Sequence, residues 1–304
     1  GAPTLSADET VETVGVYAQD EMRLTDDLSL TLGARYDRIR FAEDDRLQTP
    51  FDLSDERTFE RVSPKLGLLW QAHPRASVYL NLATAFQVPT KGELAATVGD
   101  TGFNRDLEPQ EARHAEIGVR GTTGRRWRWE ASVFQTDVDD EILPRTQVQD
   151  TTIFGNVGET RHRGVELSTE VLLGGLFELG AGYGWSENVF TSFEELTGNT
   201  IPGHPEHRAT LRLSTRRARG VNGALTFERV GTVYLDDANA ETHRPYSTLA
   251  ASLSYDFERL SVFVRGTNLT DELYASWIAV NDPFGNFFLP APGRSFTAGF
   301  DVSF

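Results

Sequence analysis

Two histidines three positions apart form the pattern in this chain that comes nearest to a metal site. His204 and His207 lie in the segment His-Pro-Glu-His, and His243 follows in a later polar segment. Imidazole nitrogens are common ligands of zinc and other divalent transition metals. No further cluster of ligand residues accompanies them in the sequence. We therefore predict no metal site, and these three histidines are the candidates against which that prediction can be tested.

Short acidic runs recur in the polar segments between apolar ones. Neighbouring carboxylates could chelate the divalent ions that bridge lipopolysaccharide, or line the entrance to a binding site, but most such runs are simply solvated. The chain has no nucleophile elbow, phosphate-binding loop or zinc-protease motif, so we predict no catalytic residues, no cofactor and no enzyme activity. The acidic runs are Glu43-Asp44-Asp45, Asp139-Asp140-Glu141, Glu194-Glu195 and Asp236-Asp237.

The composition of the 304 residues excludes several other kinds of site. The chain has no cysteine, which rules out disulfides and thiolate metal ligands. Its net charge of −16 argues against nucleic acid as a partner, because binding to phosphates needs a basic surface. Its mean hydropathy is −0.37, and no apolar run is long enough for a transmembrane helix. Membrane-spanning strands stay possible, because half of their residues face a lumen.

Apolar and polar residues alternate in segments along the whole chain, which predicts an all-β fold with no helix. In the last segment, Phe296, Ala298, Phe300 and Val302 share one face of a strand, with Ser, Thr, Gly and Asp on the other. About ten residues per strand, tilted near 45°, would cross roughly 25 Å of apolar bilayer. The predicted strands are Val11–Thr25, Leu28–Phe41, Thr58–Gln71, Arg75–Gln87, Gln110–Gly121, Arg126–Val138, Asn156–Leu173, Leu176–Phe190, Glu206–Arg217, Val221–Tyr234, Tyr246–Phe257, Leu260–Asn268 and Gly293–Phe304.

The connections between these strands alternate between two sizes. Tight turns such as Thr25–Leu28 and Leu173–Leu176 are followed by long polar segments such as Val88–Pro109 and Leu269–Pro292. A soluble sandwich has no reason to sort its connections in this way, whereas outer-membrane barrels have short periplasmic turns and long extracellular loops. We therefore predict an antiparallel up-and-down transmembrane β-barrel in the outer membrane of a Gram-negative bacterium.

Several short motifs, in order along the chain, resemble the β-barrel of the TonB-dependent receptors. The family has an S-P-(K/R)-x-G strand, an F-(R/Q)-x-P-(T/S) entry to a loop, an N-L-x-(D/N)-x-x-Y element and a P-G-R closing strand. The corresponding segments here are Ser63–Leu68, Ala76–Leu80, Ala85–Thr90, Leu107–Gln110 with Glu116–Gly118, Asn156–Gly158 with Arg163–Leu167, Asn268–Tyr274 and Pro292–Phe296.

The resemblance implies import of scarce, bulky nutrients, most often ferric siderophores and sometimes haem, cobalamin, quinone cofactors or glycans. The family barrel has about 22 strands around an N-terminal plug, and a short N-terminal box couples it to the inner-membrane TonB complex. The thirteen strands predicted here correspond to the C-terminal part of that barrel, so we expect the plug, the box and the N-terminal strands to lie outside this chain. An unclosed sheet would leave Val11–Thr25 as a bare edge, which lipid does not tolerate.

The resemblance also implies where a ligand and other partners would bind. Family members hold their ligand with aromatic, arginine and amide side chains on loop tips and in the upper lumen, and a planar cation with aromatic faces suits a catecholate or an anionic ferric chelate. The same residues could instead pack loops or form interfacial girdles. Phe304 would be the C-terminal signal for the barrel-assembly machinery, and lipid and lipopolysaccharide would surround the barrel. The candidate ligand-binding residues are Phe86, Phe103, Asn104, Arg105, Phe154, Trp277, Asn281, Phe284, Asn286 and Phe287.

Two other classes of protein remain as alternatives at this point. One is a passive, porin-like outer-membrane channel, and the other is a soluble β-sandwich that binds glycans or protein. The sandwich predicts that Phe296 and Phe300 contact a dry protein core, whereas the barrel predicts that they face lipid.

Overall fold

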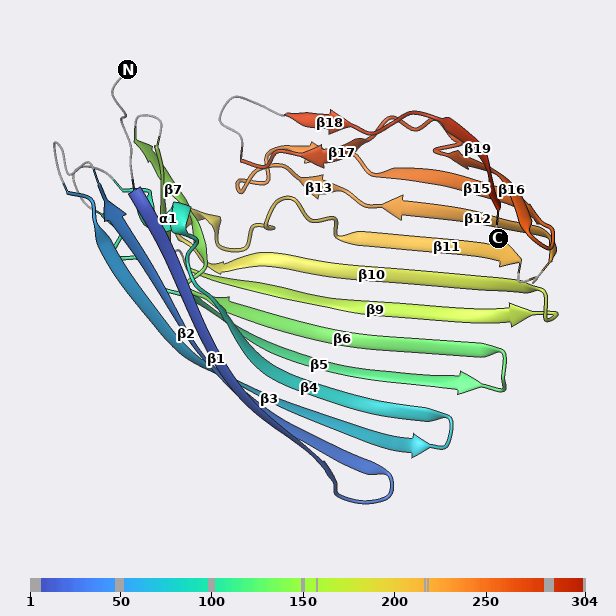
Figure 1. The fold of residues 1–304 in the computed structure, drawn as a ribbon, viewed down its shortest axis with the longest axis horizontal. Helices are drawn as coiled ribbons and strands as arrows, with labels where there is room; N and C mark the ends of the chain where they lie inside the picture. The colour runs from blue at the N-terminus through green and yellow to red at the C-terminus, as the bar shows by residue number, and fades with distance from the viewer. Residues whose placement is uncertain are drawn as a thin grey trace.

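One antiparallel sheet of thirteen strands organises the chain in the computed structural model, which describes residues 7–46, 52–97, 102–148, 151–156, 158–215, 217, 219–281 and 287–302 (Figure 1). Each strand pairs with the next long strand along the chain, as an up-and-down barrel requires. The thirteen predicted strands are therefore confirmed. They are β1 (Ala7–Arg23), β2 (Leu28–Asp45), β3 (Asp55–His73), β4 (Ala76–Gln87), β5 (Gln110–Thr123), β6 (Trp127–Asp139), β9 (Glu159–Leu173), β10 (Phe177–Ser192), β11 (His207–Thr215), β12 (Gly220–Val230), β15 (Tyr246–Asp256), β16 (Leu260–Thr267) and β19 (Ser295–Val302).

The long connections contain small elements that the alternation did not predict. Three two-stranded hairpins are β7 (Ile142–Val148) with β8 (Thr151–Asn156), β13 (Val233–Tyr234) with β14 (Thr242–His243), and β17 (Ala275–Ile278) with β18 (Phe288–Pro290). A 3₁₀ turn, η1, covers Glu194–Leu196. Short turns gather at one end of the sheet and these hairpins at the other (Figure 1).

The prediction that the chain has no helix is wrong at α1 (Lys91–Ala95). The hydroxyl oxygen of Thr90 accepts a hydrogen bond from the backbone N–H of Glu93 at 3.3 Å, and the Glu93 carboxylate accepts one from the Thr90 N–H at 2.7 Å. This capping box is encoded by Thr-x-x-Glu, a signal that was present in the sequence. Among the described residues no helix is long and apolar enough to cross a membrane.

The two faces of the sheet differ in chemistry. Residues paired across strands share a face, so Phe300 lies on the same face as its partner Val262, and Ala298 on the same face as Val264. On this outer face, 70% of Phe300 and 69% of Phe296 are exposed. In the described part of the chain no second sheet covers it, so the prediction of the sandwich is wrong and that of the barrel is confirmed.

The opposite face, which we call lumenal, is polar. One register row that crosses β3 to β10 carries Lys65, His114, Thr136, His162 and Asn188, with Ala83 of β4 as its apolar member. His114 Nδ1 and Thr136 Oγ1 are 2.9 Å apart, and His162 Nδ1 and Asn188 Oδ1 are 3.0 Å apart. The long connections fold against this face, as expected for the interior of a barrel.

The sheet divides at a proline in the middle of β3. The β3–β4 ladder ends at the pair Lys65–Ala83, next to Pro64, although β3 continues to pair with β2 as far as Asp55. Proline has no N–H with which to continue a ladder. Beyond this point β1, β2 and β3 bend away from the other strands (Figure 1). We call the line along which β3 and β4 part the seam.

The best-buried apolar cluster lies at the long-loop end of the lumenal face. Phe41 and Phe59 from the diverging strands are 7% and 4% exposed and pack edge to face, with ring centroids 6.2 Å apart. Leu94, Phe103 and Leu107 from the connection after β4 complete this cluster, which we call the upper core. A long connection is thereby packed onto the strands instead of extending into solvent.

Candidate functional site

Two groups of connections at the long-loop end form the candidate functional site (Figure 1). The first loop group comprises residues 88–97 and 102–109, after β4, and the β7–β8 hairpin. The second loop group comprises the connections after β10, β12 and β16, including the β13–β14 and β17–β18 hairpins. In an outer-membrane barrel, this end faces the outside of the cell and meets ligands first.

Arg57 of β3 anchors the first loop group. Its Nη1 donates to the carbonyl oxygens of Asn104 at 2.8 Å, Arg105 at 3.2 Å and Leu107 at 2.6 Å. Its side chain is only 11% exposed, and the guanidinium carbon lies 4.7 Å from the centre of the Phe59 ring. A single, largely buried cation therefore holds three backbone carbonyls of one connection through charge-assisted hydrogen bonds.

Asn156 ties the β7–β8 hairpin to the same connection. Its Nδ2 donates to the carbonyls of Glu108 at 2.8 Å and Asp140 at 2.6 Å, and its Oδ1 accepts from the Glu108 N–H at 2.7 Å. On the other side, Lys91 of α1 pairs with Glu9 of β1 at 2.5 Å and Glu43 of β2 at 3.0 Å. The first loop group is thus fixed to several strands at once.

The structure brings four of the predicted ligand-binding residues together in the first loop group. Phe103 is 3% exposed in the upper core, and Phe154 packs against that core. The Asn104 amide donates to the Phe154 carbonyl at 3.2 Å. Arg105 alone has a largely exposed side chain, 64%, and it forms an ion pair with Asp55. In this conformation Arg105 is the residue of the four that a ligand can reach.

Phe86 lies apart from that group. It pairs with Glu111 across β4 and β5, and it has the same parity along β4 as Leu80 and Leu82. Its ring therefore projects from the outer face, at the long-loop end of β4, and not into the lumen. That position suits the aromatic girdle of a barrel.

Amide and carboxylate groups hold the second loop group together. Asn281 accepts from the Asp237 N–H at 2.9 Å and donates to the Asp237 carboxylate at 3.0 Å. Asn239 accepts from the Thr200 N–H and donates to the Thr200 carbonyl, both at 2.7 Å. The Asp236 carboxylate accepts from two backbone N–H groups of its own turn, at 3.0 and 2.7 Å. Three connections far apart in the sequence are joined through residues 236–239.

Three of the remaining predicted ligand-binding residues, Asn281, Trp277 and Phe287, lie in the second loop group. Asn281 is committed to Asp237, as described above. Trp277 in β17 and Phe287 beside β18 are 56% and 53% exposed, so their rings are free to meet a ligand. Phe284 and Asn286 lie outside the described residues, as does Phe304.

The three candidate histidines have separate surroundings. His204 Nδ1 is 3.1 Å from the Pro202 carbonyl. His207 Nδ1 is 2.9 Å from the Tyr183 hydroxyl, on the outer face. The ring of His243 packs edge to face on that of Tyr246, 6.2 Å between centroids. In the parts of the chain that the structure describes, no three His, Asp or Glu side chains are grouped as metal ligands would be.

Sequence reasoning missed the residues that organise both loop groups. Arg57 sits inside β3 and carries no local motif, and Asn156, although it begins one of the family-like segments, gave no sign of its partners. Asn239 offered a weak signal, since its φ of 57° is a backbone conformation that asparagine adopts more readily than most residues. These residues position the loops, and their partners lie about forty to fifty positions away.

Replacing Asp237 by asparagine is expected to stabilise the second loop group at neutral pH. Burial raises the pKa of Asp237, the Asn281 amide opposes that rise, and the Asp236 carboxylate adds to it. A raised pKa in the folded loop means that the charged form is the less stable one, so stability is present in acid and is lost as the pH rises through that pKa. The asparagine imitates the protonated acid.

Amide hydrogen exchange of residues 235–241 in the purified protein measures this effect. Protection in Asp237→Asn should exceed that of the wild type at pH 7, by up to about tenfold, and should match it near pH 4. Asp236→Asn is the control, since it weakens two backbone contacts and should lower protection at both pH values. Equal protection of Asp237→Asn and wild type at pH 7 would contradict the prediction.

A family model described as TonB dependent receptor-like, beta-barrel, matches residues 1–269. The ferrioxamine receptor of Yersinia enterocolitica is 25% identical over 281 residues, which cover 87% of this chain and 36% of that receptor. The ferrioxamine B receptor of Salmonella typhimurium is 27% identical over 273 residues, which cover 86% of this chain and 37% of the receptor. The chain thus spans less than two fifths of the length of these relatives.

Solved structures share the fold. The siderophore receptor PiuA of Acinetobacter baumannii superposes with a TM-score of 0.83 at 22% identity, over 97% of this chain and 44% of PiuA. The ferric yersiniabactin uptake receptor FyuA of Yersinia pestis gives a TM-score of 0.81 at 22% identity, over 98% and 46%. The copper transporter OprC also gives 0.81, at 18% identity, over 98% and 49%, so the fold alone does not select a cargo. Since the family model covers most of the chain, the chain belongs to the TonB-dependent receptors of the Gram-negative outer membrane and forms part of their β-barrel.

Proposed function

We propose that this chain is part of an outer-membrane receptor that imports a ferric siderophore with energy from the TonB complex. The observation that carries the proposal is the match to receptors named for ferrioxamine along 86–87% of the chain. Exposed side chains on the loops also support the proposal. Arg105, Trp277 and Phe287 expose a cation and two aromatic rings at the long-loop end, which suits an anionic or aromatic iron chelate.

We also propose that the chain is the C-terminal portion of the barrel, with the plug and the other strands supplied from outside it. Within the described residues, β1 and β19 each pair with one neighbour only, on opposite edges of the sheet. A bilayer does not tolerate unpaired strand edges, so further strands must close the sheet. Phe304 as assembly signal, the barrel-assembly machinery as partner and TonB as energy source belong to the same proposal.

Uptake by the full-length receptor tests the proposed function. The receptor would be expressed in a Gram-negative strain that lacks its own siderophore receptors and is starved of iron. Radiolabelled ferric complexes of a hydroxamate, a catecholate and citrate would be supplied, with labelled cobalamin and copper as other cargoes. We expect uptake of one ferric siderophore that is lost when TonB is deleted. Uptake that persists without TonB would favour the porin-like channel, and uptake of cobalamin or copper alone would replace the siderophore.

Replacing Arg105 by glutamine is expected to weaken binding of the imported siderophore by about tenfold, because a cation that meets an anionic chelate is worth about 1.5–3 kcal/mol. The apparent Kd comes from quenching of intrinsic fluorescence in the purified full-length receptor. Arg219→Gln is the matched control, since Arg219 forms an exposed pair with Glu258 at the short-turn end, 3.2 Å apart. Equal affinity of Arg105→Gln and wild type would remove Arg105 from the binding site.

A further inference from the structure

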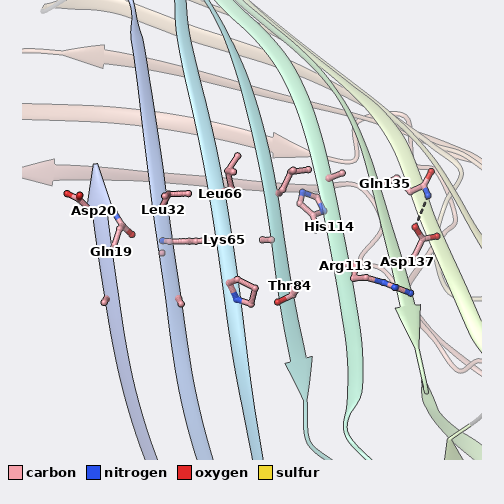
Figure 2. Close-up of a pocket in the computed structure, with 17 residues that line it drawn as sticks. Gln19, Asp20, Leu32, Lys65, Leu66, Thr84, Arg113, His114, Gln135 and Asp137 are labelled. Carbon is pink, nitrogen blue, oxygen red and sulfur yellow. Dashed lines mark hydrogen bonds between the residues drawn. The ribbon is translucent and has the colours of Figure 1, made fainter. Parts of the chain in front are cut away.

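A hollow of about 1130 Å³ lies across β1 to β6 at the seam (Figure 2). Its lining residues show which face it occupies. Most of the lining residues have outer-face parity, including Pro64 of β3 and both Gln135 and Asp137 of β6. The lumenal row contributes Lys65 and His114 but not Thr136, and it lies between two rows of outer-face residues, so the hollow opens on the outer face of the barrel. It is therefore distinct from the loop groups and from the lumen.

Small side chains form one row of the lining of the hollow. Ala18, Ala34 and Pro64 form one register row across β1, β2 and β3, and all three side chains are small. The larger side chains of Leu32, Leu66 and Leu82 stand in the adjacent row. The row of small residues ends at the seam, where β3 turns away from β4. The hollow forms because the side chains in this row are small and because β1, β2 and β3 bend away from β4.

Lipid is what this face meets, because the chain is part of an outer-membrane barrel and its outer face is exposed and apolar. Where the outer surface of a barrel is flat, any mobile acyl chain can cover it. A depression of this volume, above the range of about 300–1,000 Å³ typical of small-molecule sites, leaves its lining without contacts unless something fills it. An acyl chain has the apolar chemistry and the narrow shape for that task.

The long-loop end of the hollow carries charge. Arg113 lies at the rim, and its Nη2 is 2.5 Å from the Asp139 carboxylate. Asp137, also at the rim, accepts from Gln135 at 2.7 Å (Figure 2) and pairs with Arg161 at 2.8 Å. Arg113 is the fourth residue of β5 from its long-loop end, so this rim lies towards the extracellular side of the wall. Asp20 borders the opposite side of the hollow.

We propose that this hollow is a seat for one lipopolysaccharide molecule, with an acyl chain over Ala34 and Pro64 and a glucosamine phosphate at Arg113. Guanidinium groups bind phosphate with paired hydrogen bonds, and the neighbouring carboxylates can hold phosphate through a divalent cation. Phospholipid shares the acyl chain, but lipopolysaccharide is the phosphorylated lipid of the leaflet to which the rim belongs. The seated lipid would cover from outside the seam that the first loop group covers from inside.

Copurifying and added lipid in the full-length receptor test this site. Ala34→Trp fills the hollow and Arg113→Gln removes the cation, while Ala131→Trp on β6 and Arg219→Gln serve as matched controls outside the hollow. The probes are lipid A and phosphatidylglycerol, counted by native mass spectrometry in a mild detergent. We expect each test variant to weaken lipid A binding by about tenfold and each control to leave it unchanged.

Three outcomes would overturn the proposal: equal lipid A binding by Ala34→Trp and Ala131→Trp, no effect of Arg113→Gln, or equal retention of phosphatidylglycerol by the wild type. Heat-modifiable migration of each variant reports whether the barrel has folded. Arg113 is an exposed rim residue, so Arg113→Gln should fold and still tests the proposed lipid site if the tryptophan variant does not fold. Siderophore uptake is a separate readout, so a failure here leaves the proposed function standing.

Discussion

Replacing Arg57 by alanine is expected to release residues 102–109 from the barrel and to lower siderophore uptake about a hundredfold, while the barrel itself stays folded. The guanidinium donates to the carbonyls of Asn104, Arg105 and Leu107 from a site that is only 11% exposed. A hydrogen bond from a charged group contributes about 1.5–3 kcal/mol, so loss of the set should cost about 3 kcal/mol or more. That free energy corresponds to about a hundredfold change in the population of the docked loop.

Two measurements on the full-length receptor separate this effect from misfolding. Hydrogen exchange of residues 102–109 should rise in Arg57→Ala, while exchange in β9 and β10 stays slow. Uptake of the labelled siderophore should fall in parallel. Arg57→Lys keeps the charge but presents one ammonium in place of a planar fork, and we expect an intermediate result.

Arg38→Ala is the matched control for the same strand pair. Arg38 lies on the outer face, 3.5 Å from Glu60, and its side chain is 55% exposed. Exposed ion pairs of this kind contribute little, so exchange and uptake should resemble the wild type. If Arg57→Ala kept the loop protected, the upper core alone would hold it, and Arg57 would lose its assigned role.

The sheet was predictable from the sequence because the pattern that defines each strand lies within a short stretch of neighbouring residues. A period of two over about ten residues is enough to define a strand and both of its faces, as Phe300 and Val302 illustrate. The alternation of turn lengths then places successive strands side by side. Pro64 marks the exception, since the sequence shows a proline inside a strand, but only the pairing shows that one ladder ends there and the other continues.

The candidate site was less predictable because its contacts are long-range. The sequence predicts both Phe103 and Arg105 as ligand-binding residues, since an aromatic anchor of a loop and an aromatic ligand contact look the same in a sequence. The structure separates them by burial, at 3% for Phe103 against 64% for the Arg105 side chain. Phe86 is different, because its parity with Leu80 and Leu82 already indicated the outer face.

Replacing Phe300 by aspartate is expected to block assembly of the full-length receptor into the outer membrane. Phe300 lies on the outer face opposite Val262, and it is 70% exposed to the surroundings that lipid fills in this family. A charge on the lipid face of a barrel costs about 2–4 kcal/mol for Arg or Lys at the midplane, and the cost is smaller for aspartate and towards the interfaces. Since folded domains are stable by only about 5–15 kcal/mol, even about 1–2 kcal/mol weakens assembly.

Thr297→Asp on the same strand is the control that makes the result informative. Thr297 lies on the lumenal face opposite Arg265, so the new carboxylate stays in the polar interior and meets a cation. Heat-modifiable migration and the amount of receptor in outer-membrane fractions should therefore fall strongly for Phe300→Asp and stay near wild type for Thr297→Asp. Equal loss in both variants would mean that the strand tolerates no charge on either face. Equal assembly would mean that Phe300 does not face lipid, and the assignment of the outer face from register would then be wrong.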